Sequence, residues 1–169
     1  MFGGVENGEV VWKRIEHIDH GLLGYFLTCH LVIEHYMDEY IKATVPQFDW
    51  DKSKLTFGQR ASLLKWDVLV RDKKFDPIPA IKHMNSLRNR ISHRLEIKLD
   101  EEALQPLADY MKGLSSRPLE LPTEPKKLLE VFVSTCCATF ASHLSFQHRQ
   151  QYPNSQGSPE ASVRSSSPG

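Results

Sequence analysis

The chain has 169 residues, with 21 Lys and Arg against 21 Asp and Glu and a hydrophobic fraction of 40%. This length suits one domain, and the charged and aromatic content is that of ordinary globular proteins, which excludes wholesale disorder. The longest mainly apolar stretch, residues 21–41, is interrupted by charged side chains. A membrane span needs ~20 largely apolar residues, so we expect no membrane association. No basic region followed by an apolar core opens the chain, so no secretory signal is predicted and the expected location is the cytoplasm.

The three cysteines, Cys29, Cys136 and Cys137, include no C-x-x-C pair. A disulfide framework is not expected in a chain of this length without an export signal. The adjacent pair stands in an apolar run, VFVSTCCATF, which is most simply explained by small buried residues. A reactive or metal-bound pair is the less favoured alternative.

Charge is unevenly distributed along the chain. Residues 1–50 hold eight acidic and three basic residues, whereas residues 82–98 hold five basic residues and one acidic residue. The basic segment is either an anion-binding site or the electrostatic counterpart of the acidic N-terminal third. Charge alone leaves both interpretations open.

Composition divides the chain into three parts. Residues 1–12 are glycine-rich and are expected to be flexible, and residues 147–169 are rich in Ser, Pro and Gln and are expected to form a disordered tail. Residues 13–146 carry the apolar periodicity of a folded domain.

Helical patterns dominate that domain. Apolar residues at spacings of three and four predict a first helix over about residues 15–43, which Pro46 ends. A second helix is predicted from about residue 56 to about residue 70. Asp76 followed by Pro77 is a typical helix start, and this third helix is predicted to continue to about residue 97.

Two further helices are predicted after Asp100, which is a suitable N-cap for residues 101–112. Gly113 is expected to stop this fourth helix, and Pro106 to kink or break it early. Prolines then mark an extended link before a last helix over about residues 125–146. The expected fold class is all-α, an antiparallel bundle of four to five helices.

The third helix carries the most informative pattern. At about 100° per residue, its apolar residues form one stripe, and a polar arc lies beside that stripe. Arg88 stands at the edge between the two, and Arg90 and Arg94 lie behind the arc. The residues of the polar arc are Asn85, Asn89, Ser92, His93 and Glu96.

The string RNRISH at residues 88–93 resembles the Arg-x4–6-His motif of the HEPN superfamily, whose members are all-α bundles. HMNSL at residues 83–87 is similar to the family's apolar-Asn-x-Leu lead-in. LTFGQR at residues 55–60 and DHG at residues 19–21 resemble segments of its mannitol-repressor-like branch. The resemblance covers about residues 14–112.

In catalytic members of the superfamily this motif cleaves RNA without a metal, and two copies of it meet across a homodimer. The resemblance therefore implies catalytic roles for Arg88 at the scissile phosphate, for Asn89 in orienting groups and for His93 as the acid–base group. Imidazole titrates near neutral pH and guanidinium pairs with phosphate, so these residue types suit that chemistry. Further contacts with the RNA substrate are expected from residues on the same helix, namely Asn85, Arg90, Ser92 and Arg94.

We therefore expect a cytoplasmic, metal-independent endoribonuclease of toxin or antiviral-defence type, which forms a homodimer, leaves 2′,3′-cyclic phosphate ends and uses no cofactor. A cognate antitoxin or a regulatory protein is an expected partner. The sequence lacks the Tyr that follows the motif as His-x-Tyr in nucleotidyltransferase-linked HEPN toxins, so regulation through that residue is not implied.

Two alternatives remain open. A non-catalytic HEPN protein would bind another protein or act as a mannitol-repressor-like regulator, and a third class is a bundle that binds a small ligand or nucleotide. Two metal sites are weaker hypotheses: a divalent-ion site at Glu34 and Asp38, with His35 and Glu39 beside them, and a zinc site at His17, His20 and His30.

Overall fold

The computed structural model describes residues 2–6, 9–13, 18–47, 49–50, 52–64, 75–93 and 98–151. Side chains are described within residues 18–145 of these ranges, apart from that of His93. Five helices make up the described domain, which confirms the all-α class. They are α1 (His20–Thr44), α2 (Phe57–Leu63), α3 (Ile78–His93), α4 (Glu101–Leu114) and α5 (Pro125–Gln151).

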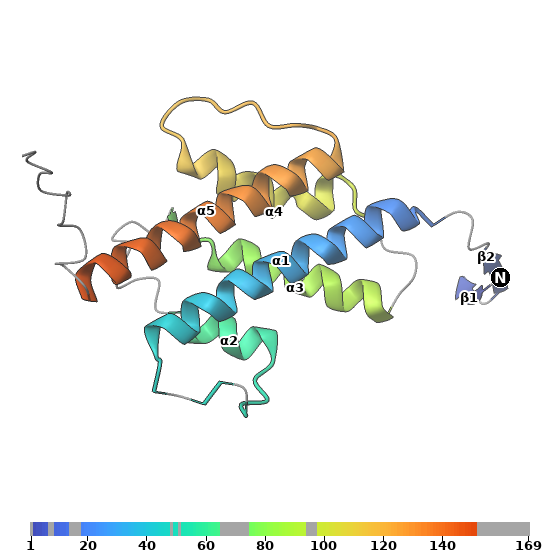
Figure 1. The fold of residues 1–169 in the computed structure, drawn as a ribbon. Coiled ribbons are helices and arrows are strands. Elements are labelled where there is room, and N and C mark those ends of the chain that lie inside the picture. Colours follow the sequence, from blue (N-terminus) through green and yellow to red (C-terminus); the bar gives the residue numbers. More distant parts are fainter. Residues whose placement is uncertain are drawn as a thin grey trace, which may run out of the picture.

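The two longest helices, α1 and α5, lie against each other, and α3 and α4 lie behind them (Figure 1). The short α2 contacts both α1 and α3 at one end of the molecule. These contacts bring α1, α2 and α3 together on the side of the bundle away from α4.

The helix directions differ in part from the predicted antiparallel arrangement. Helix α3 is antiparallel to α1, but α1 and α5 run in the same direction, because Gly21 lies beside Lys126 near one end and Tyr40 contacts Phe140 near the other. The cause is the link over residues 115–124, which passes back along the bundle before α5 begins (Figure 1). The antiparallel prediction is therefore wrong for this pair.

The starts of α3 and α4 follow the predicted capping residues, and α1 begins after a cap that was not predicted. The carboxylate of Asp19 accepts a hydrogen bond from the Leu22 N–H, which places the start of α1 at His20 rather than near residue 15. Asp76 accepts one from the Ile78 N–H at the start of α3, and Asp100 caps α4 through the Ala103 N–H. Each carboxylate satisfies an N–H that has no partner within the helix.

Several predicted helix ends are wrong. Helix α2 ends at Leu63, and the extended backbone of Leu64 follows, so the predicted end near residue 70 is too late. A helix of seven residues depends on tertiary packing for its stability, so periodicity along the chain does not fix where it stops. Residues 65–74 lie outside the described part of the chain.

Helix α4 is neither broken by Pro106 nor stopped by Gly113, and it reaches Leu114. Proline within a helix costs about 3 kcal/mol, which the buried apolar face of α4 offsets. Helix α5 continues to Gln151, so the start of the predicted tail at residue 147 is too early, and residues 152–169 lie outside the described ranges. Residues 94–97, where α3 was predicted to end, also lie outside them.

A two-stranded hairpin, not predicted from the sequence, precedes the bundle and lies apart from the helices in Figure 1. Strand β1 (Phe2–Glu6) pairs antiparallel with β2 (Glu9–Lys13), with Glu6 opposite Glu9. The two residues between the strands are Asn-Gly, the pair most favoured in two-residue hairpin loops. The hairpin, with its local sequence signal, lies in the part of the chain where residues 1–12 were expected to be flexible.

The core is formed by side chains from all five helices. Helix α3 contributes Ile81, Met84 and Leu87 of its predicted apolar stripe, each 1% exposed or less, and Ile91 of the same stripe packs partly buried against the core. The stripe therefore faces the core, which leaves the polar arc of α3 on the outside of this packing.

Two of the three cysteines, Cys29 and Cys136, are buried in that core, and Cys137 is half-buried. Burial raises the pKa of Cys29 to about 11 and that of Cys136 further still. A raised pKa keeps a thiol protonated and unreactive, so the interpretation of these two cysteines as core residues is confirmed.

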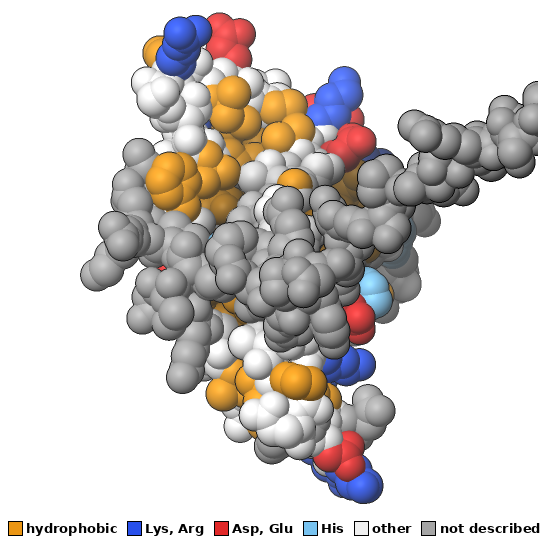
Figure 2. Space-filling model, turned by 60° about the vertical axis from the view of Figure 1, so that its left-hand side comes forward, with side chains coloured by type: hydrophobic (Ala, Val, Ile, Leu, Met, Phe, Trp, Pro, Cys, Tyr) orange, Lys and Arg blue, Asp and Glu red, His pale blue; other side chains and the backbone are white. Residues whose placement is uncertain are grey.

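One helical segment in the described part of the chain, Pro125–Ser145, is long and apolar enough to cross a membrane by length and composition. A core helix of a soluble protein passes the same test. Hydrophobic side chains are also visible on the face in Figure 2, at the height of α4 and the link to α5. Leu119 of this link is 43% exposed.

A matched pair of Leu→Ala substitutions tests the assignment of the core. Leu87→Ala removes a fully buried side chain and should lower the free energy of unfolding by about 2–5 kcal/mol. Leu31→Ala alters a side chain that is 63% exposed and should change it by less than about 0.5 kcal/mol. Denaturant unfolding of both variants checks this, and equal losses would contradict the assignment.

Candidate functional site

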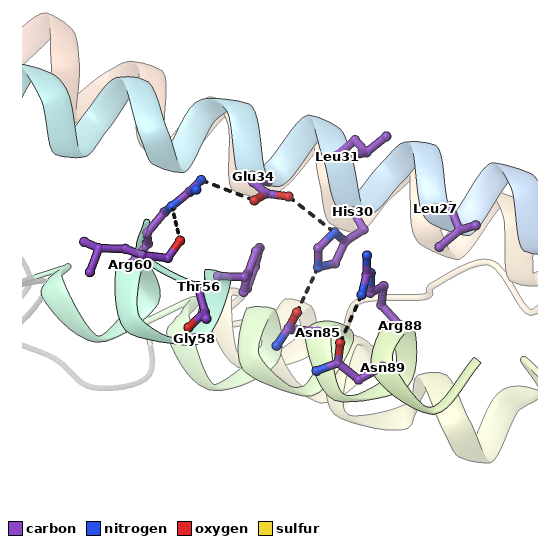
Figure 3. A pocket seen from close by; sticks show the side chains of 12 residues that line it. Leu27, His30, Leu31, Glu34, Thr56, Gly58, Arg60, Asn85, Arg88 and Asn89 are labelled. Carbon is purple, nitrogen blue, oxygen red and sulfur yellow. Dashed lines mark hydrogen bonds and ion pairs between the residues drawn. The ribbon is translucent and has the colours of Figure 1, made fainter. Parts of the chain in front are cut away.

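A half-open pocket of about 810 Å³ lies where α1, α2 and α3 meet (Figure 3). Its lining combines apolar side chains with a small set of polar and charged ones. The apolar residues come from α1 and the start of α2, and the polar ones come from all three helices. The lining residues are Leu27, His30, Leu31, Glu34, Leu55, Thr56, Phe57, Gly58, Arg60, Asn85, Arg88 and Asn89.

Three of the predicted site residues, Asn85, Arg88 and Asn89, line this pocket. Arg90 and Ser92 are exposed on the same helix but are not part of the lining. His93 is the last residue of α3, and its side chain lies outside the described ones, as does all of Arg94. The pocket therefore contains half of the Arg-x4-His motif that the sequence singled out.

Arg88 presents a cation at the pocket mouth. Its Nη1 donates a hydrogen bond of 3.3 Å to Asn89 Oδ1, so Arg88 at the edge of the polar arc turns toward that arc. Within the described residues, no carboxylate lies in ion-pair distance of Arg88. The guanidinium thus keeps donors available for an anion.

His30 lies at the floor of the pocket and is 4% exposed. Its Nε2 is 3.2 Å from Asn85 Oδ1, and its Nδ1 is 4.0 Å from Glu34 Oε2. The ring packs on Phe57, with 4.6 Å between the ring centroids. These contacts fix the imidazole against α3 and α2.

Burial lowers the pKa of His30, and the charge of Arg88 acts in the same direction. The hydrogen bond to Asn85 and the carboxylate of Glu34 oppose this shift without cancelling it. His30 is therefore neutral at pH 7, with one ring nitrogen as a donor and the other as an acceptor.

Arg60 connects α2 to the acidic residues of α1. Its Nη1 lies 3.2 Å from Glu34 Oε1 and 2.7 Å from Asp38 Oδ2. Thr56 and Gln59 form a capping box that fixes the start of α2 and so the position of Arg60. The two carboxylates that the sequence suggested as ion ligands instead bind a guanidinium.

No group of three or more His, Cys, Asp or Glu side chains within the described residues is arranged to hold a metal ion. Of the suggested zinc ligands, His30 contacts Asn85, and His17 lies outside the described residues. The polar groups of the pocket suit proton transfer and anion binding.

The sequence did not indicate that His30 and Arg60 line the pocket. His30 was named only as a possible zinc ligand, and Arg60 only within a segment that carries the resemblance. A signal for His30 was present, because Phe26, His30, Ile33 and Met37 follow the spacing of a buried stripe. A polar residue at such a position must find buried partners. The sequence contains no comparable pattern that would predict the contact of Arg60 with α1.

Comparison of the chain with protein-family models, curated proteins and solved structures finds no match. The function is therefore inferred from the pocket and the motif that enters it.

The lowered pKa of His30 predicts a pH-dependent stability. Because the unfolded chain binds this proton more readily, the stability that neutral His30 contributes is present above the unfolded pKa of about 6.5 and is lost as pH falls through the folded pKa. Thermal unfolding followed by circular dichroism should show a lower Tm at about pH 5 than at about pH 7.5.

His30→Gln should weaken this dependence, whereas His35→Gln, at an exposed position on the same helix, should leave it unchanged. Burial also lowers the pKa of His143, so part of the dependence should remain in the His30 variant. An identical pH dependence in the wild type and in His30→Gln would contradict the burial of a neutral imidazole.

Proposed function

We propose that the protein is a metal-independent endoribonuclease. The observation that supports this most is the position of Arg88 and Asn89, which line a half-enclosed pocket with a buried neutral imidazole. A guanidinium that has no ion pair among the described residues matches a phosphate. Apolar walls beside it suit the flat face of a nucleobase.

In this proposal Arg88 binds the scissile phosphate and offsets the charge that develops in the transition state. Asn89 holds the Arg88 guanidinium in place, because Asn89 Oδ1 accepts a hydrogen bond from Arg88 Nη1. His93, one turn beyond Asn89 on α3, is the acid–base group. The ribose 2′-OH attacks the adjacent phosphorus, the bond to the 5′-oxygen breaks, and a 2′,3′-cyclic phosphate remains.

The resemblance to the HEPN superfamily supports the same chemistry, and the proposal includes a role as a cytoplasmic toxin or antiviral-defence nuclease. It also implies a homodimer in which two motifs meet, and a cognate antitoxin or regulatory protein. A C₂ homodimer would double the sparse set of Arg88 and His93 across its axis.

Cleavage of single-stranded RNA in EDTA tests the proposal. The wild type should cut RNA but spare DNA, which lacks the 2′-OH. Arg88→Ala should lower the rate ~10²–10³-fold, and His93→Ala should lower it ~10²–10⁴-fold. Arg90→Ala is the matched control, because Arg90 is exposed on the same helix but outside the pocket lining.

Both Arg88 and Arg90 are exposed, so both variants should retain the wild-type Tm. A wild type that cuts no RNA, alone or in an extract that contains its partners, would overturn the nuclease proposal. Equal loss of activity in the Arg88 and Arg90 variants would show that activity depends on the total positive charge of α3 and not on the position of Arg88 at the pocket.

A non-catalytic protein that acts through protein binding is the second candidate. One observation favours it: Leu27 and Leu31, one turn apart on α1 at the pocket, are 40% and 63% exposed. Exposed neighbouring leucines are typical of binding surfaces. This candidate and the nuclease share the expectation of a second protein at this face.

Sedimentation equilibrium tests that expectation. We expect a homodimer, and Leu31→Lys should shift it toward monomer while leaving Tm unchanged, because the side chain is exposed in the single chain. Lys52→Ala, at an exposed residue of the loop between α1 and α2, is the control. A wild type that stays monomeric would remove the homodimer from both candidates.

A further inference from the structure

The α3 residue that contacts His30 of α1 and the residue His93 lie on opposite sides of Arg88 in the sequence of α3. His30 contacts Asn85, which precedes Arg88 by three residues, or about 4.5 Å along the helix axis. His93 follows Arg88 by five residues, or about 7.5 Å. A phosphate held by Arg88 would therefore have His30 toward one side of it and the backbone position of His93 toward the other, within one chain.

We propose that His30 is a further catalytic residue, the general base that takes the proton from the ribose 2′-OH, with His93 as the general acid. This role rests on the proposed nuclease function. It gives one chain both groups that the reaction needs, whereas the motif alone provides one imidazole per chain.

The contacts of His30 suit this role. When Nε2 donates to Asn85 Oδ1, Nδ1 carries the lone pair that accepts a proton. The 4.0 Å between Nδ1 and Glu34 Oε2 is too long for a hydrogen bond. Nδ1 therefore keeps its lone pair for the one proton of a hydroxyl group that enters the pocket.

Charged groups from three helices face the imidazole. Glu34 on α1 stabilises the imidazolium that forms when the proton is taken, while Arg60 on α2 holds the Glu34 carboxylate in place. Burial lowers the pKa of His30, and the positive charge of Arg88 on α3 acts in the same direction. The neutral imidazole therefore predominates at pH 7. Phe57 packs on the ring and restricts its rotation.

The reaction balances in two proton transfers. His30 Nδ1 takes the 2′-OH proton, the 2′-oxygen forms a bond to phosphorus, and the bond from phosphorus to the 5′-oxygen breaks. Protonated His93 gives its proton to the departing 5′-oxygen. The products are a 2′,3′-cyclic phosphate and a 5′-hydroxyl, and water restores the two protonation states.

A pair of RNA substrates separates the base from the acid. One is unmodified, and in the other sulfur replaces the 5′-bridging oxygen of a single linkage, so the leaving group needs no proton. His30→Gln should lose ~10²–10⁴-fold in rate on both substrates. His93→Ala should lose a similar factor on the first substrate and recover most of it on the second.

His35→Gln is the matched control, at an exposed position on the same helix, and should cut both substrates at the wild-type rate. Activity of the wild type should fall as pH drops below the pKa of His30. That pKa is measured independently by NMR titration of the wild-type imidazole, so this readout holds even where His30→Gln fails to fold.

Each outcome decides the role of His30. Recovery of His30→Gln on the sulfur substrate, an unchanged rate in His30→Gln, or an acidic limb at a different pH from the NMR titration would overturn it while leaving the nuclease proposal intact. A wild type that cuts neither substrate would overturn the nuclease proposal and this role with it.

Discussion

The imidazole of His30 is buried where α1, α2 and α3 meet, and the geometry of the pocket depends on how it is satisfied. An unpaired polar group in that position would cost about 1–3 kcal/mol. Asn85, which lies on the polar side of the apolar stripe of α3, provides the partner. The contact acts together with the buried apolar stripe of α3 to set the rotation of α3 relative to α1, which places Arg88 and Asn89 at the pocket (Figure 3).

Electrostatics reinforce the same junction. The acidic residues of α1 that line or flank the pocket are bound by Arg60, a basic residue from α2 rather than from the basic segment of α3. Part of the negative charge of the N-terminal third is thus neutralised by α2, which lies outside the basic segment at residues 82–98. Arg88 remains free of a described carboxylate, which favours an anion-binding interpretation of that segment over a purely structural one.

The direction of α5 explains which side of α1 is left to form the pocket. The link over residues 115–124 returns along the molecule, so α5 packs parallel to α1 and covers its other side. Cys29 and Tyr40 are buried on α1, and Tyr40 contacts α5 through Phe140. With that face covered, the side of α1 that carries His30 and Glu34 is left to meet α2 and α3.

The sequence by itself determined the helical class, the capped starts of α3 and α4, and the apolar stripe of α3, because these depend on residues within a few positions of one another. It also indicated Asn89 on a polar arc with Arg88 at the edge of that arc. Only the tertiary structure decided the parallel packing of α1 and α5, the early end of α2, and the meeting of His30 with Asn85. Those features depend on contacts between distant segments, 55 residues apart for His30 and Asn85 and farther apart for Tyr40 and Phe140. Helical periodicity carries no information about which distant faces meet.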